Sequence, residues 1–247
     1  MQRNKLGLLG KNIDYSFSRS YFSEKFKREN LDFSYTNFDI DSLEKLQSII
    51  SNKSLIGFNV TIPYKEEIIH HLDSINDEAK TIGAVNTVVI NSSGKLIGFN
   101  TDYWGFTESL RPHLKTNHKK ALILGTGGAA KAIAYVLKQF GISFKYVSRK
   151  ESDNMLINYN ELQSSIIESH KLIINCTPLG TYPKIENAPE IPYEFITNQH
   201  ILFDLIYNPE KTLFLKKGEA RGATIINGYK MLVLQAERAF QIWQNYI

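Results

Sequence analysis

Two segments of the sequence place a lysine and an aspartate among small polar side chains. GFNVTIPYK at residues 57–65 ends on Lys65, and GFNTD at residues 98–102 ends on Asp102. Each begins as an apolar run typical of a buried strand. A lysine ammonium can stabilise negative charge on an oxygen and donate a proton to it, and a carboxylate can hold that ammonium in place. If the segments lie side by side, they form a pocket suited to acid–base chemistry; an ordinary surface salt bridge is the alternative.

A glycine-rich turn follows another apolar run. In LILGTGGAAKA at residues 122–132, Gly125, Gly127 and Ala130 match the G-x-G-x-x-G/A spacing of a dinucleotide-binding turn. The first glycine permits a tight turn, the second lets a pyrophosphate approach the backbone, and the third small residue lets the helix pack on the sheet. The helix N-terminus then offers amides to the anion. Because strands flank this turn and its helix, dinucleotide binding is favoured over plain strand–helix packing.

The end of the next strand indicates which dinucleotide is bound. Ser148, Arg149 and Lys150 stand where an NAD site usually places an acid for the ribose 2′-hydroxyl. Two cations suit a 2′-phosphate instead, and a guanidinium can bind it through two hydrogen bonds. The segment therefore favours NADP, with an exposed basic turn as the alternative.

The composition is that of a globular protein with enough apolar residues for two cores. The chain has 247 residues, 43% of them hydrophobic, and a net charge of +4 with both signs mixed along its length. A nucleic-acid binder would concentrate its basic residues. The single cysteine, Cys176, excludes an internal disulfide, and the six histidines form no ligand pattern, so we expect no metal. We also expect neither a membrane span nor a signal peptide, and hence a cytoplasmic protein.

Strands and helices alternate along the sequence that must position these residues. In the first half we expect strands at 5–9, 33–38 and 55–60, helices at 18–29, 42–50 and after Pro63, and two strands at 83–90 and 95–100 joined by a turn. In the second half we expect a helix at 103–114, the glycine-turn unit, parallel strands at 171–177 and 201–207, an irregular loop at 181–195, a helix after Pro209, a strand at 223–227 and a helix at 229–246. The predicted fold class is α/β.

Seven segments, in this order, resemble signature motifs of the shikimate dehydrogenase family. They are NVTIPYK at 59–65, GAVNT at 83–87, GFNTDYWG at 98–105, GTGGAA at 125–130, NCTPLGTYP at 175–183, DLIYNP at 204–209 and NGYKMLVLQ at 227–235. The resemblance runs nearly from end to end. It implies a substrate domain of residues 1–102 plus 227–247, whose last helix returns to it, and a Rossmann-like NADP-binding domain of residues 103–226 with a parallel sheet.

The implied reaction is the reversible reduction of 3-dehydroshikimate to shikimate with NADPH, in aromatic amino-acid biosynthesis. The implied partner is this small substrate, without nucleic acid or membrane, in a monomer or homodimer. Lys65 and Asp102 match the catalytic pair, and Ser16 and Ser18 match hydroxyls that bind the substrate carboxylate. The implied contacts to the substrate ring are Asn59, Thr61, Asn86, Tyr207 and Gln235.

The resemblance also implies a set of cofactor contacts. The pyrophosphate would lie against Gly125, Gly127, Gly128, Ala129 and Ala130, the 2′-phosphate against Ser148, Arg149 and Lys150, and the nicotinamide against Thr177, Leu205, Gly228 and Met231, with Asp77 as a further contact. Structural alternatives exist for several of these residues. Asn59 and Asn86 could simply hold their loops together, and Met231 could fill the core.

One loop departs from the family pattern. KNIDYSFSR at residues 11–19 keeps both serines, but Asn12, Tyr15 and Arg19 replace a proline, a histidine and a second proline. We expect carboxylate binding to persist, while the geometry of the loop is open. Arg19 could add a charge to the carboxylate or face the solvent.

Three other functions remain open at this stage. A quinate/shikimate dehydrogenase would differ in substrate and cofactor breadth, which one hydroxyl can decide. A non-catalytic sensor of pathway metabolites would not need both Lys65 and Asp102. A folate-pathway dehydrogenase would share the two-domain architecture without the paired serines.

Overall fold

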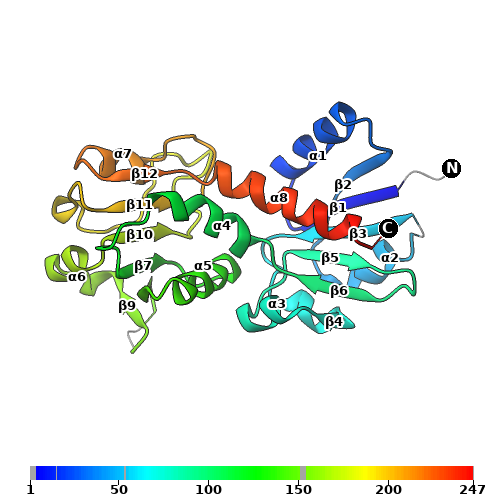
Figure 1. Cartoon of the computed structure of the whole chain (residues 1–247), viewed down its shortest axis with the longest axis horizontal. Coiled ribbons are helices and arrows are strands. Elements are labelled where there is room, and N and C mark those ends of the chain that lie inside the picture. Colours follow the sequence, from blue (N-terminus) through cyan, green and yellow to red (C-terminus); the bar gives the residue numbers. More distant parts are fainter. Residues whose placement is uncertain (1–3, 15, 53, 151–153, 247) are drawn as a thin grey trace. The chain divides into compact units, whose positions relative to one another are not determined.

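The computed structural model describes residues 4–14, 16–52, 54–150 and 154–246, and its internal contacts divide the chain into two compact units (Figure 1). Unit 1 is Met1–Thr101 with Ala236–Ile247, and unit 2 is Asp102–Gln235. Each unit is built on a six-stranded sheet with helices packed against it. The predicted α/β fold class with two sheets is confirmed.

The sheet of unit 1 is mixed. Its strands run in the order β2-β1-β3-β5-β6-β4. The first three are parallel to one another, β5 is antiparallel to both β3 and β6, and β4 is parallel to β6. The bounds are β1 Asn4–Gly10, β2 Phe33–Asp39, β3 Leu55–Val60, β4 Ser74–Ile75, β5 Thr87–Ile90 and β6 Leu96–Phe99.

Two apolar clusters cover the two faces of this sheet. One joins Leu6 and Leu8 of β1 to α1 (Phe17–Arg28) and to the second half of α8 (Tyr229–Gln244). The other joins β3 to α2 (Leu46–Ile50), the 3₁₀ helix η2 (Glu67–His71) and α3 (Asp77–Ile82). In the first cluster Trp243 of α8 is 1% exposed, and its Nε1 donates a hydrogen bond of 2.9 Å to the Val88 carbonyl of β5. Residues of α8 therefore complete the core of unit 1.

The sheet of unit 2 is parallel throughout, in the order β12-β11-β10-β7-β8-β9. Successive strand residues alternate between two clusters, one shared with α4, α5 and the start of α8, the other with α6 and α7. The sheet is thus covered by helices on both faces, as expected for buried parallel strands. The bounds are α4 Asp102–Leu110, β7 Lys120–Leu124, α5 Gly128–Gln139, β8 Ser143–Ser148, β9 Leu156–Asn158, α6 Ser164–Ser169, β10 Leu172–Asn175, β11 Ile201–Asp204, α7 Leu213–Glu219 and β12 Thr224–Ile226.

The helix predicted after Pro63 differs in type and start. The backbone forms turns through Glu66, and only then a 3₁₀ helix, η2. The Lys65 carbonyl accepts a hydrogen bond of 2.7 Å from Val85 N, and Ile69 N donates instead to the Glu66 carbonyl at 3.3 Å. A tertiary contact thus takes the acceptor that an α-helix would use for Ile69.

Two negative findings concern only the described part of the chain. Within it, no helix is long and apolar enough to cross a bilayer. Nor does it contain a cluster of three or more histidine, cysteine or acidic side chains able to hold a metal ion.

Candidate active site

The atypical loop after β1 is fixed by a carboxylate from the neighbouring strand. Asn12 N and Ile13 N each donate a hydrogen bond of 2.9 Å to the Asp39 side chain at the end of β2. Asn12 has a φ of 56°, in the left-handed region, which asparagine tolerates better than most residues. Tyr15 lies outside the described residues. The loop thus has a defined course up to Asp14 although its sequence departs from the family pattern.

The two candidate carboxylate-binding serines begin helix α1. Ser16 is the N-cap residue, and its Oγ accepts a hydrogen bond of 3.2 Å from Ser18 N. Ser18 is buried, at 8% exposure, and Tyr35 on β2 is buried at 6% exposure. Burial raises the pKa of Tyr35 well above its ordinary value, so this phenol stays neutral. Tyr35 in turn donates a hydrogen bond of 2.8 Å to Asn59 Oδ1.

Asn59 and Asn86 join the polar segments of unit 1 to one another. Asn59 Nδ2 donates to the Asn86 carbonyl and to Thr87 Oγ1, both at 3.1 Å. Asn86 Oδ1 accepts a hydrogen bond of 2.7 Å from Thr101 N, and its Nδ2 donates to Thr101 Oγ1 at 3.0 Å. Both asparagines are buried, at 5% and 2% exposure. They hold their loops together, and their roles as ring contacts stay predictions.

The candidate catalytic residues Lys65 and Asp102 come soon after the segments that the hydrogen bonds of Asn59 and Asn86 join. Lys65 is half-buried in the turn after β3, and Asp102, 5% exposed, is the first residue of α4 and directly follows Thr101. Thr61, also half-buried, pairs its backbone N–H with the Leu9 carbonyl at 2.9 Å. Because Lys65 belongs to unit 1 and Asp102 to unit 2, their pairing stays a prediction.

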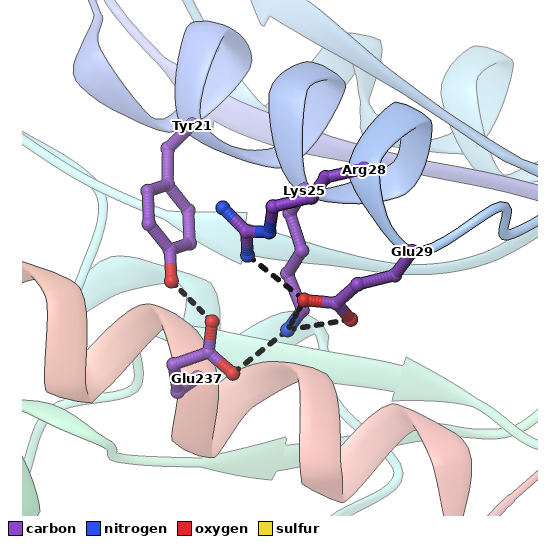
Figure 2. A network of polar contacts seen from close by, with 5 residues as sticks. All are labelled: Tyr21, Lys25, Arg28, Glu29 and Glu237. Atoms are coloured by element: carbon purple, nitrogen blue, oxygen red, sulfur yellow. Dashed lines mark hydrogen bonds and ion pairs between the residues drawn. The ribbon is translucent and has the colours of Figure 1, made fainter.

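A charged network connects α1 to the middle of α8 (Figure 2). Glu237 of α8 accepts a hydrogen bond from the Tyr21 hydroxyl and forms an ion pair of 3.0 Å with Lys25 Nζ. Lys25 is buried, at 6% exposure, and also pairs with Glu29 at 3.0 Å. The Arg28–Glu29 pair at 2.8 Å is exposed. Helix α1, which Ser16 caps, is therefore joined to α8 by ion pairs to a buried lysine.

Two other unit 1 residues from the sequence analysis lie at the surface. Asp77 is exposed in the first turn of α3, where an acid favours the helix dipole. Arg19 is exposed, and its guanidinium donates a hydrogen bond of 3.4 Å to the Asp14 carbonyl. The cofactor role of Asp77 stays a prediction.

The glycine turn of unit 2 has the geometry expected of a pyrophosphate site. Gly125 has a φ of 104°, a conformation that other L-residues avoid. Gly127 is the N-cap of α5 without a side-chain cap, and a Cβ added there would meet no atom within 4 Å. Gly128 and Ala129 form the first turn of α5, and Ala130 is fully buried. Because the helix amides face open space, the turn fits a dinucleotide phosphate.

The other candidate cofactor residues come from the carboxyl ends of neighbouring parallel strands. Ser148 ends β8, and its Oγ accepts a hydrogen bond of 3.0 Å from Lys150 N; the Arg149 and Lys150 side chains are exposed. Thr177 follows β10, and its Cγ2 lies 3.3 Å from a Cβ built on Gly125. In open parallel sheets, ligands bind at this edge, beside the point where strand order reverses, here between β7 and β10.

Leu205 and Gly228 meet at the same edge. Leu205 follows β11, and a Cβ on Gly228 would collide with the Leu205 carbonyl, so only glycine fits there. Of the α8 candidates, Met231 is 6% exposed within the apolar cluster shared with α4 and α5, and Gln235 donates from Nε2 to the Leu232 carbonyl at 3.0 Å. Tyr207 is half-buried.

Burial raises the pKa of the Cys176 thiol strongly, and the nearby carboxylates of Asp204 and Asp102 raise it further. A thiol of this kind stays protonated and is a poor nucleophile. This agrees with a structural role for Cys176.

Two buried groups that support these candidates were not predicted from the sequence. Tyr35 is hydrogen-bonded to Asn59 in unit 1, and Asp204, fully buried at the end of β11, is hydrogen-bonded to Asn175 and Thr212 in unit 2. Asp204 lies within the DLIYNP segment, so a carboxylate in an otherwise apolar strand was the available signal.

Strand order and glycine turn together define an α/β protein with a Rossmann-type dinucleotide-binding unit. Residues 8–88 match the family model described as the shikimate dehydrogenase substrate binding domain. Shikimate dehydrogenase (NADP(+)) of Desulforamulus reducens is 34% identical, over 97% of this chain and 89% of the relative. The chain belongs to the shikimate dehydrogenase family.

Solved structures agree with this family. Shikimate dehydrogenase 1 from Peptoclostridium difficile is 38% identical, with a TM-score of 0.86 over 99% of this chain and 92% of that one. The Thermus thermophilus shikimate 5-dehydrogenase, solved in complex with NADP(H) and shikimate, is 30% identical, with a TM-score of 0.86 over 98% and 94%.

Proposed function

We propose that the protein is an NADP-dependent shikimate dehydrogenase, which interconverts 3-dehydroshikimate and shikimate in aromatic amino-acid biosynthesis. The observation that carries the proposal is similarity over nearly the whole chain to relatives of that name. The glycine turn beside the β7/β10 switch point supports it independently, because it fits a dinucleotide.

The cofactor is assigned to unit 2. The turn from Gly125 to Ala130 would hold its pyrophosphate through backbone amides, and Arg149 with Lys150 would face its 2′-phosphate. Thr177, Leu205 and Gly228 would surround the nicotinamide. Bound NADPH supplies the hydride that reduces the ketone.

The proton is assigned to Lys65. As the ketone carbon gains a hydride, its oxygen gains negative charge, and the Lys65 ammonium stabilises that charge and donates the proton. Asp102 would orient the ammonium and a substrate hydroxyl. In the reverse direction the Lys65 amine accepts the hydroxyl proton while the hydride leaves carbon.

The substrate carboxylate is assigned to the hydroxyls of Ser16 and Ser18 at the start of α1. The N-cap bond from Ser18 N to Ser16 Oγ, which holds the two serines next to each other at the helix start, supports this assignment. Asn59, Thr61, Asn86, Tyr207 and Gln235 are assigned to the ring hydroxyls, where an unpaired buried hydroxyl would cost affinity.

The test is NADP⁺ reduction by the purified protein with shikimate, with quinate and NAD⁺ run in parallel. We expect turnover selective for shikimate and NADP⁺, and we expect Lys65→Ala to lower kcat by at least about 100-fold, as loss of a general acid or base typically does. Lys80→Ala, which removes an exposed lysine on α3, is the matched control.

Comparable turnover with quinate or NAD⁺ would indicate the broader relative. Binding of shikimate without turnover would indicate a metabolite sensor. Unchanged kcat in Lys65→Ala would remove that lysine from the reaction.

A further inference from the structure

A fully buried carboxylate lies behind the nicotinamide side of unit 2. Asp204 and Asn175, both with 0% exposure, end the adjacent strands β11 and β10, where they pair in register. Asp204 Oδ1 accepts hydrogen bonds from Asn175 Nδ2 at 3.0 Å and from Ile206 N at 3.1 Å. Its Oδ2 accepts one of 2.5 Å from Thr212 Oγ1. The side chain is too deeply buried to touch a ligand, so any effect on one passes through its neighbours.

The Asn175 amide nitrogen donates to Asp204 and, in a longer bond of 3.4 Å, to the Leu179 carbonyl, so Asp204 is the stronger of the two acceptors that orient the amide. Because a carboxylate only accepts, Asn175 must turn its NH₂ group toward Asp204 and its oxygen the other way. That oxygen accepts two hydrogen bonds from Thr177, one from the backbone N–H at 3.0 Å and one from Oγ1 at 2.7 Å. A flipped amide would present NH₂ to the Thr177 N–H and lose that bond.

The hydrogen bonds that run from Asp204 through Asn175 end at Thr177, which is a residue of the proposed cofactor site. Its methyl group lies 3.3 Å from a Cβ built on Gly125, the first glycine of the dinucleotide turn. Its Oγ1 also accepts a hydrogen bond of 3.3 Å from Leu179 N, so the loop after β10 depends on the rotamer of this residue. The Asn175 carbonyl accepts a hydrogen bond of 3.0 Å from Leu205 N, another proposed nicotinamide contact.

We propose that Asp204 is a positioning residue for cofactor binding, which orients the Asn175 amide so that Thr177 is held against the glycine turn. The inference rests on the proposed function, since it assigns NADP to this edge of the sheet. It predicts that loss of Asp204 weakens NADP⁺ binding more than shikimate binding, because both proposed carboxylate contacts of the substrate lie in unit 1, although Tyr207 and Gln235 lie in unit 2.

The test is calorimetric measurement of the dissociation constant of NADP⁺ for wild type, Asp204→Ala, Asp204→Asn, Thr177→Val and Thr212→Val. We expect Asp204→Ala to weaken NADP⁺ binding about ten-fold, the effect of losing the stronger acceptor of a buried amide. Asp204→Asn keeps an oxygen for Asn175 and should bind within about three-fold of wild type. In both variants the KM for shikimate should change by less than the dissociation constant of NADP⁺.

Thr212→Val is the matched control. It removes a donor to the same carboxylate on the side away from Asn175, so it should lower the melting temperature and leave NADP⁺ affinity unchanged. If Asp204 had only a structural role, both variants would weaken NADP⁺ binding in proportion to their loss of stability. That outcome would overturn the proposal.

The double variant tests the route of the effect. If Asp204 acts through Thr177, the effects of Asp204→Ala and Thr177→Val on NADP⁺ affinity should be less than additive. Full additivity would overturn the proposal. Should Asp204→Ala fail to fold, wild-type NADP⁺ affinity in Thr177→Val would overturn it as well.

If the proposed function itself were wrong, the binding experiment would give a different result. In that case the wild-type protein would not bind NADP⁺ in the same calorimeter. Wild-type binding with unchanged affinity in Asp204→Ala would reject only the role of Asp204.

Discussion

At the scale of single residues, buried polar groups in this protein are consistently used to fix backbone segments. Asn86 holds the residue before Asp102, and Asp204 holds the ends of two strands. Burial raises the pKa of Asp204 to about 6, although three hydrogen bonds to its carboxylate oppose the shift. The cost of burying these groups is met by saturating them with hydrogen bonds, which is why they specify position.

Two buried histidines, His118 and His200, also fix backbone segments; they lie just before the unit 2 strands β7 and β11. His118 Nδ1 accepts a hydrogen bond of 2.8 Å from Lys115 N, and its Nε2 donates one of 3.2 Å to the Gln199 carbonyl. His200 Nδ1 likewise accepts from Thr197 N at 3.0 Å. Protonation of Nδ1 would remove these acceptors, so both rings are held in the neutral state.

Acid should therefore destabilise unit 2. Burial lowers the pKa of both histidines below the ordinary 6.5, so the unfolded chain binds more protons than the folded one. This contribution to stability is complete above about pH 6.5 and is lost as the pH falls below it. Asp204, whose pKa burial raises to about 6, contributes with the opposite sign, so we expect the effect of the histidines to appear as a difference between wild type and a histidine variant at about pH 7.5 and about pH 5.5.

The measurement is thermal unfolding at each pH, with His118→Asn as the variant. At the higher pH this change should cost about 1–2 kcal/mol through the lost bond to Gln199, and the difference from wild type should shrink at the lower pH. The variant His71→Asn changes an exposed histidine and should unfold like wild type at both pH values. A His118 variant as acid-sensitive as wild type would contradict the assignment.

At the scale of elements, the packing of α1 within unit 1 matters because the candidate carboxylate-binding serines lie at the start of this helix. Phe22 and Phe26 pack with Phe240 and Trp243 of α8, and the Figure 2 network lies beside them. Lys25 Nζ also lies 5.2 Å from the centre of the Phe240 ring. Ion pairs and apolar contacts thus stabilise the packing of the same two helices, α1 and α8.

Glu237→Gln should destabilise this pair of helices. The change removes one of the two carboxylates that pair with buried Lys25 and leaves Glu29, so we expect a loss of roughly 1–2 kcal/mol in chemical denaturation. Arg28→Gln is the matched comparison, because the Arg28–Glu29 pair is exposed and should contribute less than about 1 kcal/mol. Equal losses in the two variants would show that burial of Lys25 does not matter.

The sequence predicted the long elements and some short strands such as β12, but it missed other short elements. Apolar runs such as 120–124 and 172–175 were found because strands buried on both faces need them. The two residues of β4, the three of β9 and the six-residue helices α3 and α6 are too short to show a period. At the site, motif residues such as Asn59 were predicted, whereas Tyr35 was not, because its partners are distant in sequence.

At the scale of the whole molecule, the chain passes from unit 1 to unit 2 and back. The two tryptophans fall one in each unit: Trp243 is buried in unit 1, and Trp104 is 38% exposed in unit 2. Every candidate cofactor residue except Asp77 belongs to unit 2, and Ser16, Ser18, Asn59, Thr61 and Asn86 belong to unit 1. A substitution that disrupts the apolar core of one unit should therefore weaken one binding function, for substrate or for NADP⁺, more than the other.

Trp243→Ala tests this separation. Removing this side chain from the core of unit 1 should cost about 3–5 kcal/mol and abolish shikimate binding, since α1 and β5 lose a shared contact. NADP⁺ affinity, measured by calorimetry, should stay near that of wild type. Tyr246→Ala, at an exposed position after α8, serves as control. Parallel loss of both affinities would show that the units do not bind independently.

The return of the chain to unit 1 also has a consequence for synthesis. Ala236, Ala239, Phe240 and Trp243 cover the sheet face that carries Leu6 and Leu8, yet they are translated after the whole of unit 2. Domains generally fold as units while the chain emerges. An apolar face of unit 1 therefore stays uncovered until all of unit 2 has been translated, so unit 1 can complete its core only after that.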